Sequence, residues 1–146
     1  MKFNILTHGL LIAGLAGPLA AGAADSSLPT IHPMTEGNIT YVSGGFGIDE
    51  RDALAAVAKD YNLKLVFAEQ GTGAYLADVK VSIVGTKGQK VLDAVSNGPW
   101  FMARLPAGHY KITAAVEGKS LVRKAAVTHG RHTQLDFYWR PAVLGD

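Results

Sequence analysis

The sequence contains no cysteine, which excludes several kinds of chemistry at once. Disulfides, thiol nucleophiles, thiolate metal sites and a lipid-modified N-terminal cysteine all require that residue. A folded domain made from this chain must therefore be held together by its hydrophobic core. The 146 residues, of which 48% are hydrophobic, are enough to build the core of one domain.

Charged residues are also few, at 18% of the chain, and the formal net charge is only +2. No long run of lysine or arginine is present, and the basic residues are scattered among acidic and apolar ones. Domains that bind nucleic acid usually carry a clustered basic face. We therefore expect no nucleic-acid partner.

Hydrophobic runs are too short to cross a membrane. The main apolar run, Leu10–Ala20, follows Lys2 and falls short of the roughly 20 residues that span a bilayer. Small residues follow it, which is the order of a secretory signal peptide. We expect residues 1–24 to be a signal peptide cleaved after Ala23 or Ala24, with no membrane span left; an N-terminal anchor is the alternative. A bacterial periplasm is the expected destination, and secretion beyond it is the other interpretation.

Proline and glycine divide the rest of the chain into segments. Residues 25–38 are rich in Ser, Thr and Pro and predict a flexible leader. Residues 39–70 predict a strand–helix–strand extension, with Asp49 as the helix cap. The apolar positions of this helix recur on one stripe, formed by Leu54, Val57, Ala58 and Tyr61.

Residues 74–140 show short alternating runs with turn signals about every ten residues, and residues 141–146 form a tail. This spacing predicts a mainly β fold, an antiparallel immunoglobulin-like or prealbumin-like sandwich with one N-terminal helix packed on it. At its centre we expect a tight turn built by Pro106, Gly108 and Tyr110. Pro106 presets one φ angle, Gly108 supplies a positive φ, and Tyr110 begins the next strand.

The same residues resemble carboxypeptidase regulatory-like domains of small exported bacterial proteins. The resemblance covers about Ala77–Trp139 and implies a seven-stranded, prealbumin-like antiparallel sandwich. It also implies a domain that assists folding or binding, with no catalytic residues to carry over. The motifs that carry it are Val79-Lys80-Val81, the turn at 85–88, Gly98-Pro99-Trp100, Leu105-Pro106-Ala107-Gly108-His109-Tyr110-Lys111-Ile112, Glu117-Gly118 and Leu135-Asp136-Phe137.

The register of that resemblance assigns faces to the side chains. Phe101 and Tyr138 fall on the outward parity and are the candidate interaction face, with packing under the helix as the alternative. The inward positions are Trp100, Met102, Leu105, Tyr110, Ile112, Leu135, Phe137 and Trp139.

Three other functions are open. His109, His129 and His132 could hold zinc or copper if the fold gathers them, although a polar hairpin explains the last two equally well. Trp100 or Trp139 could bind sugar if exposed. Transthyretin-like hydrolases of 5-hydroxyisourate use histidines and arginine and end in Tyr-Arg-Gly-Ser, whereas this chain has Tyr138-Trp139-Arg140-Pro141.

We therefore expect no enzyme, no catalytic residues, no metal and no cofactor. The leading hypothesis is a non-catalytic periplasmic or secreted module that binds an envelope protein or polymer.

Overall fold

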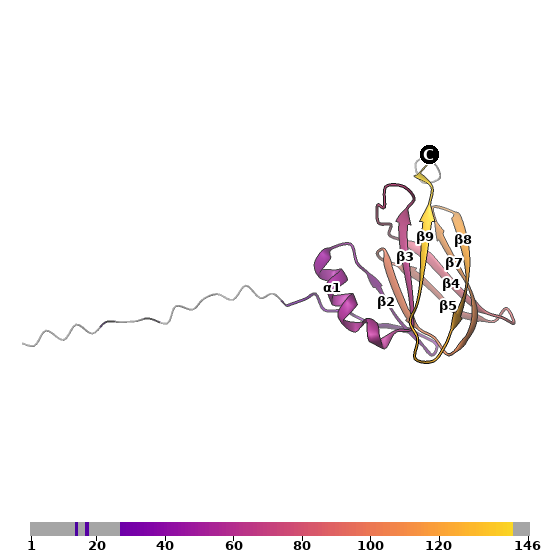
Figure 1. Ribbon diagram of the computed structural model, residues 1–146, viewed down its shortest axis with the longest axis horizontal. Helices are drawn as coiled ribbons and strands as arrows, with labels where there is room; N and C mark the ends of the chain where they lie inside the picture. The colour runs from indigo at the N-terminus through magenta and orange to yellow at the C-terminus, as the bar shows by residue number, and fades with distance from the viewer. Residues whose placement is uncertain (1–13, 15–16, 18–26, 142–146) are drawn as a thin grey trace, which may run out of the picture.

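The computed structural model describes residues 14, 17 and 27–141, which form a β-sandwich with one helix on its outside (Figure 1). The expected signal peptide, apart from residues 14 and 17, lies outside the described residues, and so does the tail from residue 142 onward. In the part of the chain that is described, no helix has the length and apolar character needed to cross a membrane.

Among the described residues, nine strands form two sheets. One sheet has five strands in the order β1-β2-β6-β3-β9, and the other has four in the order β5-β4-β7-β8. The bounds of the strands are β1 Met34–Glu36, β2 Ile39–Gly44, β3 Leu63–Glu69, β4 Val79–Gly85, β5 Lys90–Ser96, β6 Trp100–Arg104, β7 Gly108–Val116, β8 Lys119–Val127 and β9 Thr133–Trp139.

This architecture confirms the prediction of a mainly β sandwich with one N-terminal helix, but it differs in three details. β1 lies within the segment 25–38, where a flexible leader is expected, and pairs with β2. β2 and β3, expected as part of an extension, are hydrogen-bonded into the five-stranded sheet. β3 also pairs with β9 in parallel, so the sandwich is not wholly antiparallel. The sequence pattern of residues 39–70 predicts the strands themselves. It does not predict which strands they pair with, because those strands are distant in the sequence.

The main core lies between the two sheets, where an aromatic group formed by Phe67, Phe137 and Trp139 is buried. Their ring centroids lie 5.7 to 6.2 Å apart, which is the range of favourable aromatic contacts. The Trp139 Nε1–H donates to the Lys119 carbonyl oxygen at 3.1 Å. This bond ties the end of β9 to the start of β8 and so links one sheet to the other.

The helix α1, Ile48–Val57, continues into a 3₁₀ turn, Ala58–Asp60. It begins two residues earlier than the Asp49 cap predicts: Gly47 is the N-cap and no side chain caps it. Instead, the Glu50 carboxylate accepts the Gly45 N–H at 2.6 Å and holds the chain that enters the helix. The predicted apolar stripe is confirmed, and it packs on Val42 and Met102 in a second core outside the five-stranded sheet.

Strand β6 corrects the predicted faces. Phe101 is 0% exposed and stacks on Tyr41 inside the sandwich, so the expectation of an exposed Phe101 is wrong. Met102 and the half-buried Trp100 face α1 instead of the space between the sheets. Because β6 is a central strand covered on both sides, all its residues from 100 to 103 are apolar, and the sequence carries no alternation from which a face can be assigned.

The Pro106–Tyr110 turn is held by a side chain rather than by a glycine. The Tyr110 hydroxyl donates to the Pro106 carbonyl oxygen at 2.5 Å. Gly108 begins β7 and has no positive φ, so its predicted role in the turn is wrong. The alternation of β7 gives its inward face correctly, because Tyr110 and Ile112 are both buried in the main core.

We expect Tyr110→Phe to lower the free energy of unfolding at neutral pH by about 1–2 kcal/mol, since a partly buried hydrogen bond is lost. Burial raises the pKa of Tyr110 above its usual value of 10.0, so its contribution is present below pH 10 and is lost as pH rises through the folded-state pKa. The stability difference between Tyr110→Phe and wild type should therefore narrow above pH 10. Urea unfolding of the two proteins at pH 7 and above pH 10 measures this stability difference and its change with pH. A stability difference that grows with pH would contradict this account.

Candidate functional site

One end of the sandwich carries an open cleft of about 630 Å³ where segments distant in the sequence meet. Strand register explains the meeting: Thr40 pairs with Arg104, and Leu63 pairs with both Ala103 and Thr133. The chain segments next to these residues therefore share one edge. The cleft is lined by Asn38, Thr40, Lys59, Asp60, Tyr61, Asn62, Arg104, Leu105, Pro106, Ala107, His129, Gly130, Arg131 and His132. We call it the basic cleft.

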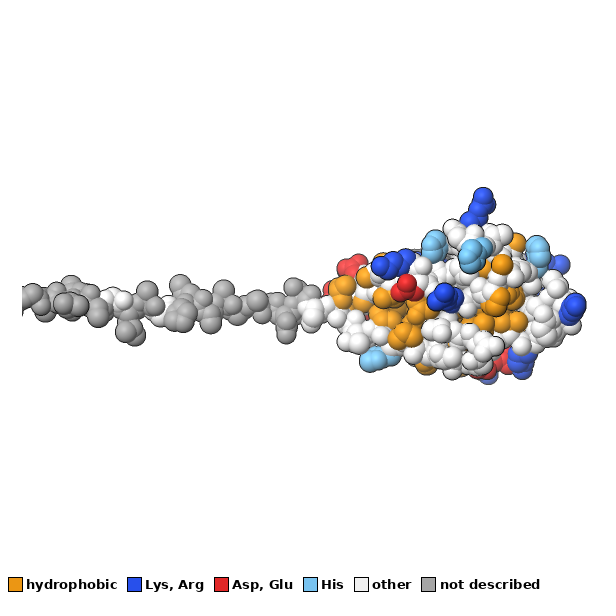
Figure 2. All heavy atoms as spheres, turned by 90° about the horizontal axis from the view of Figure 1, so that it is seen from below, with side chains coloured by type: hydrophobic (Ala, Val, Ile, Leu, Met, Phe, Trp, Pro, Cys, Tyr) orange, Lys and Arg blue, Asp and Glu red, His pale blue; other side chains and the backbone are white. Residues whose placement is uncertain are grey.

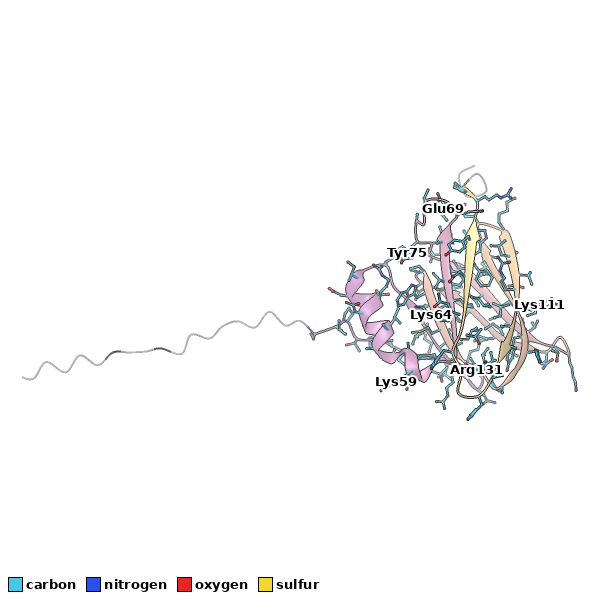
Figure 3. All side chains as sticks on the ribbon, viewed as in Figure 1. Lys59, Lys64, Glu69, Tyr75, Lys111 and Arg131 are labelled. Carbon is cyan, nitrogen blue, oxygen red and sulfur yellow. The ribbon has the colours of Figure 1, made fainter. Side chains whose placement is uncertain are left out.

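The charged side chains that line the basic cleft are mostly cationic. They are Lys59, Arg104 and Arg131, with a single carboxylate, Asp60. The cleft thus holds an excess of two positive charges with its histidines neutral, as much as the formal net charge of the entire chain. Figure 2 views the molecule from this end and shows basic and histidine side chains on it, with acidic ones sparse. Figure 3 places Lys59 and Arg131 at the same lower end.

Asn62 fixes the loop that carries Pro106 and Ala107. Its side-chain amide donates to the Leu105 carbonyl oxygen at 2.7 Å, and its side-chain oxygen accepts the Leu105 N–H at 2.9 Å. The Asn62 backbone carbonyl also accepts the Thr133 N–H at 2.9 Å. One residue therefore joins three of the segments that form the cleft.

His132 is held in one orientation. Its Nδ1 lies 2.7 Å from the Tyr61 carbonyl oxygen. Because a carbonyl oxygen only accepts, Nδ1 carries a proton and donates, which leaves Nε2 for a ligand. Tyr61 itself is buried, and burial, with a smaller effect from the neighbouring Asp60 charge, raises the pKa of its hydroxyl, so this side chain stays neutral.

We expect Asn62→Ala to lower the free energy of unfolding by about 2 kcal/mol, because both polar groups of the Leu105 backbone lose their partner. Asn38→Ala is the matched control, since Asn38 is an exposed asparagine of the same cleft. Chemical denaturation of the two variants tests this, and equal midpoints would show that Asn62 does not hold the loop.

The basic cleft continues into a second hollow of about 410 Å³ on the outer face of the five-stranded sheet. The two share Lys59, Tyr61, Asn62 and His132. Lys64 lines the continuation, and its Nζ lies 3.4 Å from the centroid of the Trp100 ring. Burial lowers the pKa of Lys64, while the Asp136 carboxylate opposes that change.

The structure brings together only two of the candidate functional residues singled out in the sequence, His129 and His132. Tyr138 is 49% exposed near the far end of β9, and Phe101 is buried in the core, so the two do not form one surface. His129 and His132 both line the basic cleft, whereas His109 lines a different hollow beside Lys111 and Lys124. Within residues 27–141, no group of three or more His, Cys, Asp or Glu side chains could hold a metal ion.

Neither tryptophan is a free platform for sugar. Trp139 is buried in the core, and Lys64 lies over the ring of Trp100. The cleft cations Lys59, Arg104 and Arg131 were not predicted from the sequence. The feature that these three residues share is their position, because each lies at the end of a helix or strand or in a connection between two strands.

Comparison with known proteins adds little to this picture. No family model matches the chain. No curated protein matches it. A solved structure, that of Klebsiella pneumoniae 5-hydroxyisourate hydrolase, is similar with 22% identity and a TM-score of 0.44, over 57% of this chain and 87% of that chain. Similarity at this level does not bear on activity.

Proposed function

We propose that this chain is an exported, non-catalytic β-sandwich module that binds an envelope protein or polymer, in a bacterial periplasm or outside the cell. The observation that carries the proposal is the basic cleft. It gathers three exposed cations from separate segments at one end of a rigid sandwich. Loops placed by a rigid scaffold are where binding residues concentrate.

Export rests on the N-terminal pattern, in which Lys2 and the apolar run of residues 10–20 precede small residues. The resemblance to carboxypeptidase regulatory-like domains supports the same role, since it implies binding without catalysis. The mass of the exported chain tests the first part. It should correspond to a chain that begins at Ala24 or Asp25, and a chain that keeps residues 1–23 would contradict cleavage.

Binding is tested with the chain purified in its exported form. The envelope of the source organism is separated into a protein-depleted polymer fraction and a solubilised protein fraction, and retention of the chain on each is measured against concentration. We expect saturable retention on one of the two. Absence of saturable retention on both would contradict the proposed function.

A hydrolase is the second candidate, because the cleft brings two histidines, His129 and His132, beside two arginines, Arg104 and Arg131. Because transthyretin-like hydrolases of 5-hydroxyisourate use histidines and arginine, such an enzyme would require these side chains to meet in one pocket. The segment Tyr138–Arg140, which departs from the Tyr-Arg-Gly-Ser tail of those hydrolases, lies at the opposite end of β9 from the cleft. Turnover of 5-hydroxyisourate that is lost in His132→Gln would favour the hydrolase over the binding module.

A further inference from the structure

We propose that the basic cleft binds an acidic polysaccharide, and this proposal rests on the proposed function as a binding module. Lys59, Arg104 and Arg131 are its contact cations, and all three are exposed. Within residues 27–141, one ion pair lies at salt-bridge distance, between Lys90 and Asp93, and it includes none of these cations. The three cleft cations therefore form no salt bridge within the described residues, and the single carboxylate of the lining, Asp60, leaves an excess of two positive charges.

The exposure of these cations favours a ligand with many acid groups. One exposed ion pair contributes little, because water and salt screen it and the side chain must be ordered. When one ligand forms several such pairs, their binding free energies add, because the entropy of bringing that ligand to the surface is lost only once. A polymer with an acid group on each repeating unit has this property, and a small monovalent anion does not.

The shape of the site favours an extended ligand. The basic cleft is open to solvent, and it leads into the second hollow, where Lys64 and Gln134 line the path. Figure 3 shows Lys64 above Lys59 and Arg131, on the outer face of the same sheet. A polysaccharide several sugar units long can therefore contact cations in both hollows.

The lack of a large exposed hydrophobic side chain in either hollow favours a polysaccharide over a protein. Protein interfaces are usually centred on buried aromatic or aliphatic side chains. None of the large exposed hydrophobic side chains of residues 27–141 lines either hollow. Asn38 and Thr40 instead offer an amide and a hydroxyl, which suit sugar hydroxyl groups.

Hydrogen bonds also hold the backbone segments of the site together. The Asn62 bonds to Leu105 and the His132 bond to Tyr61 connect the segments that carry the cations. Segments held in this way lose less backbone entropy on binding, although the exposed cation side chains must still be ordered.

The test measures binding of the exported chain to polygalacturonate, dextran sulfate, neutral dextran and polyglutamate by calorimetry at low salt. We expect saturable binding to one or both acidic polysaccharides, with the carboxylate and sulfate polymers distinguishing the acid group, and none to neutral dextran. The variant with Lys59→Glu, Arg104→Glu and Arg131→Glu should raise the dissociation constant at least about tenfold. The milder variant with glutamine at the same positions should fall between it and wild type.

A matched control variant distinguishes the effect of the cleft cations from the effect of net charge alone. Lys80→Glu, Lys111→Glu and Lys124→Glu change the net charge equally, on the exposed face of the other sheet, and should change the constant by less than about threefold in salt that screens distant charges. Equal losses in the two variants, tighter binding to polyglutamate, or no binding to either acidic polysaccharide would each overturn the proposal. In the last case, saturable retention on an envelope fraction would still support the binding module.

Discussion

Replacing Phe101 with alanine is expected to lower the free energy of unfolding by about 3–5 kcal/mol. Phe101 has no exposed surface, and its ring stacks on Tyr41 with centroids 5.4 Å apart. Deleting the ring leaves a cavity between two sheets that cannot close without moving whole strands. Because native domains are stable by only about 5–15 kcal/mol, this loss is a large part of the total.

Tyr138→Ala is the matched control, since Tyr138 is an aromatic residue of the same sheet with half of its surface exposed. Its cost should be within about 0.5 kcal/mol. Urea unfolding of both variants provides the comparison. Similar stabilities of the two variants would mean that Phe101 is not a core residue.

Gly98→Ala is expected to cost about 3 kcal/mol, because the new methyl group has no space. A Cβ at residue 98 would lie 2.5 Å from the backbone carbonyl carbon and oxygen of Gly44. The surrounding connection cannot move freely, since Ser96 Oγ donates to the Gly98 carbonyl oxygen at 2.7 Å. The Phe67 N–H also donates to the Pro99 carbonyl oxygen at 2.8 Å.

Gly108→Ala is the control for this substitution. A Cβ at Gly108 would lie 3.5 Å from the Tyr110 hydroxyl, an ordinary contact, and Gly108 has no positive φ. Thermal unfolding should show Gly98→Ala lowered by roughly 10 °C in Tm and Gly108→Ala nearly unchanged. A larger loss of Tm for Gly108→Ala than for Gly98→Ala would contradict the structure of the connection at residue 98 and of the Pro106–Tyr110 turn.

Local patterns predicted much of the fold. The alternating runs of 79–83 and 110–116 lie within β4 and β7, and Glu117-Gly118 makes the connection from β7 to β8. These segments each bury one face, so the period of two is visible in the sequence. The segment 100–103 buries both faces, so there the period is lost.

The basic cleft could not be predicted, because it depends on strand order. Lys59, Arg104 and Arg131 lie 45 and 27 residues apart along the chain, and no spacing rule connects them. Only the pairing of β3 with both β6 and β9 brings their segments to one end. Scattered charge in a sequence therefore did not mean scattered charge on the surface.

The most direct test of the central claim is a map of ligand contacts on the isotope-labelled exported chain, by NMR titration with polygalacturonate oligomers. The account predicts that the amide signals that move belong to residues 59–62, 104–107 and 129–132, which line the basic cleft. It also predicts that signals from the outer face of the four-stranded sheet, around Lys80 and Lys111, stay in place. Shifts centred on that face or around Tyr138, or no shifts at all, would contradict the claim that the basic cleft is the binding site.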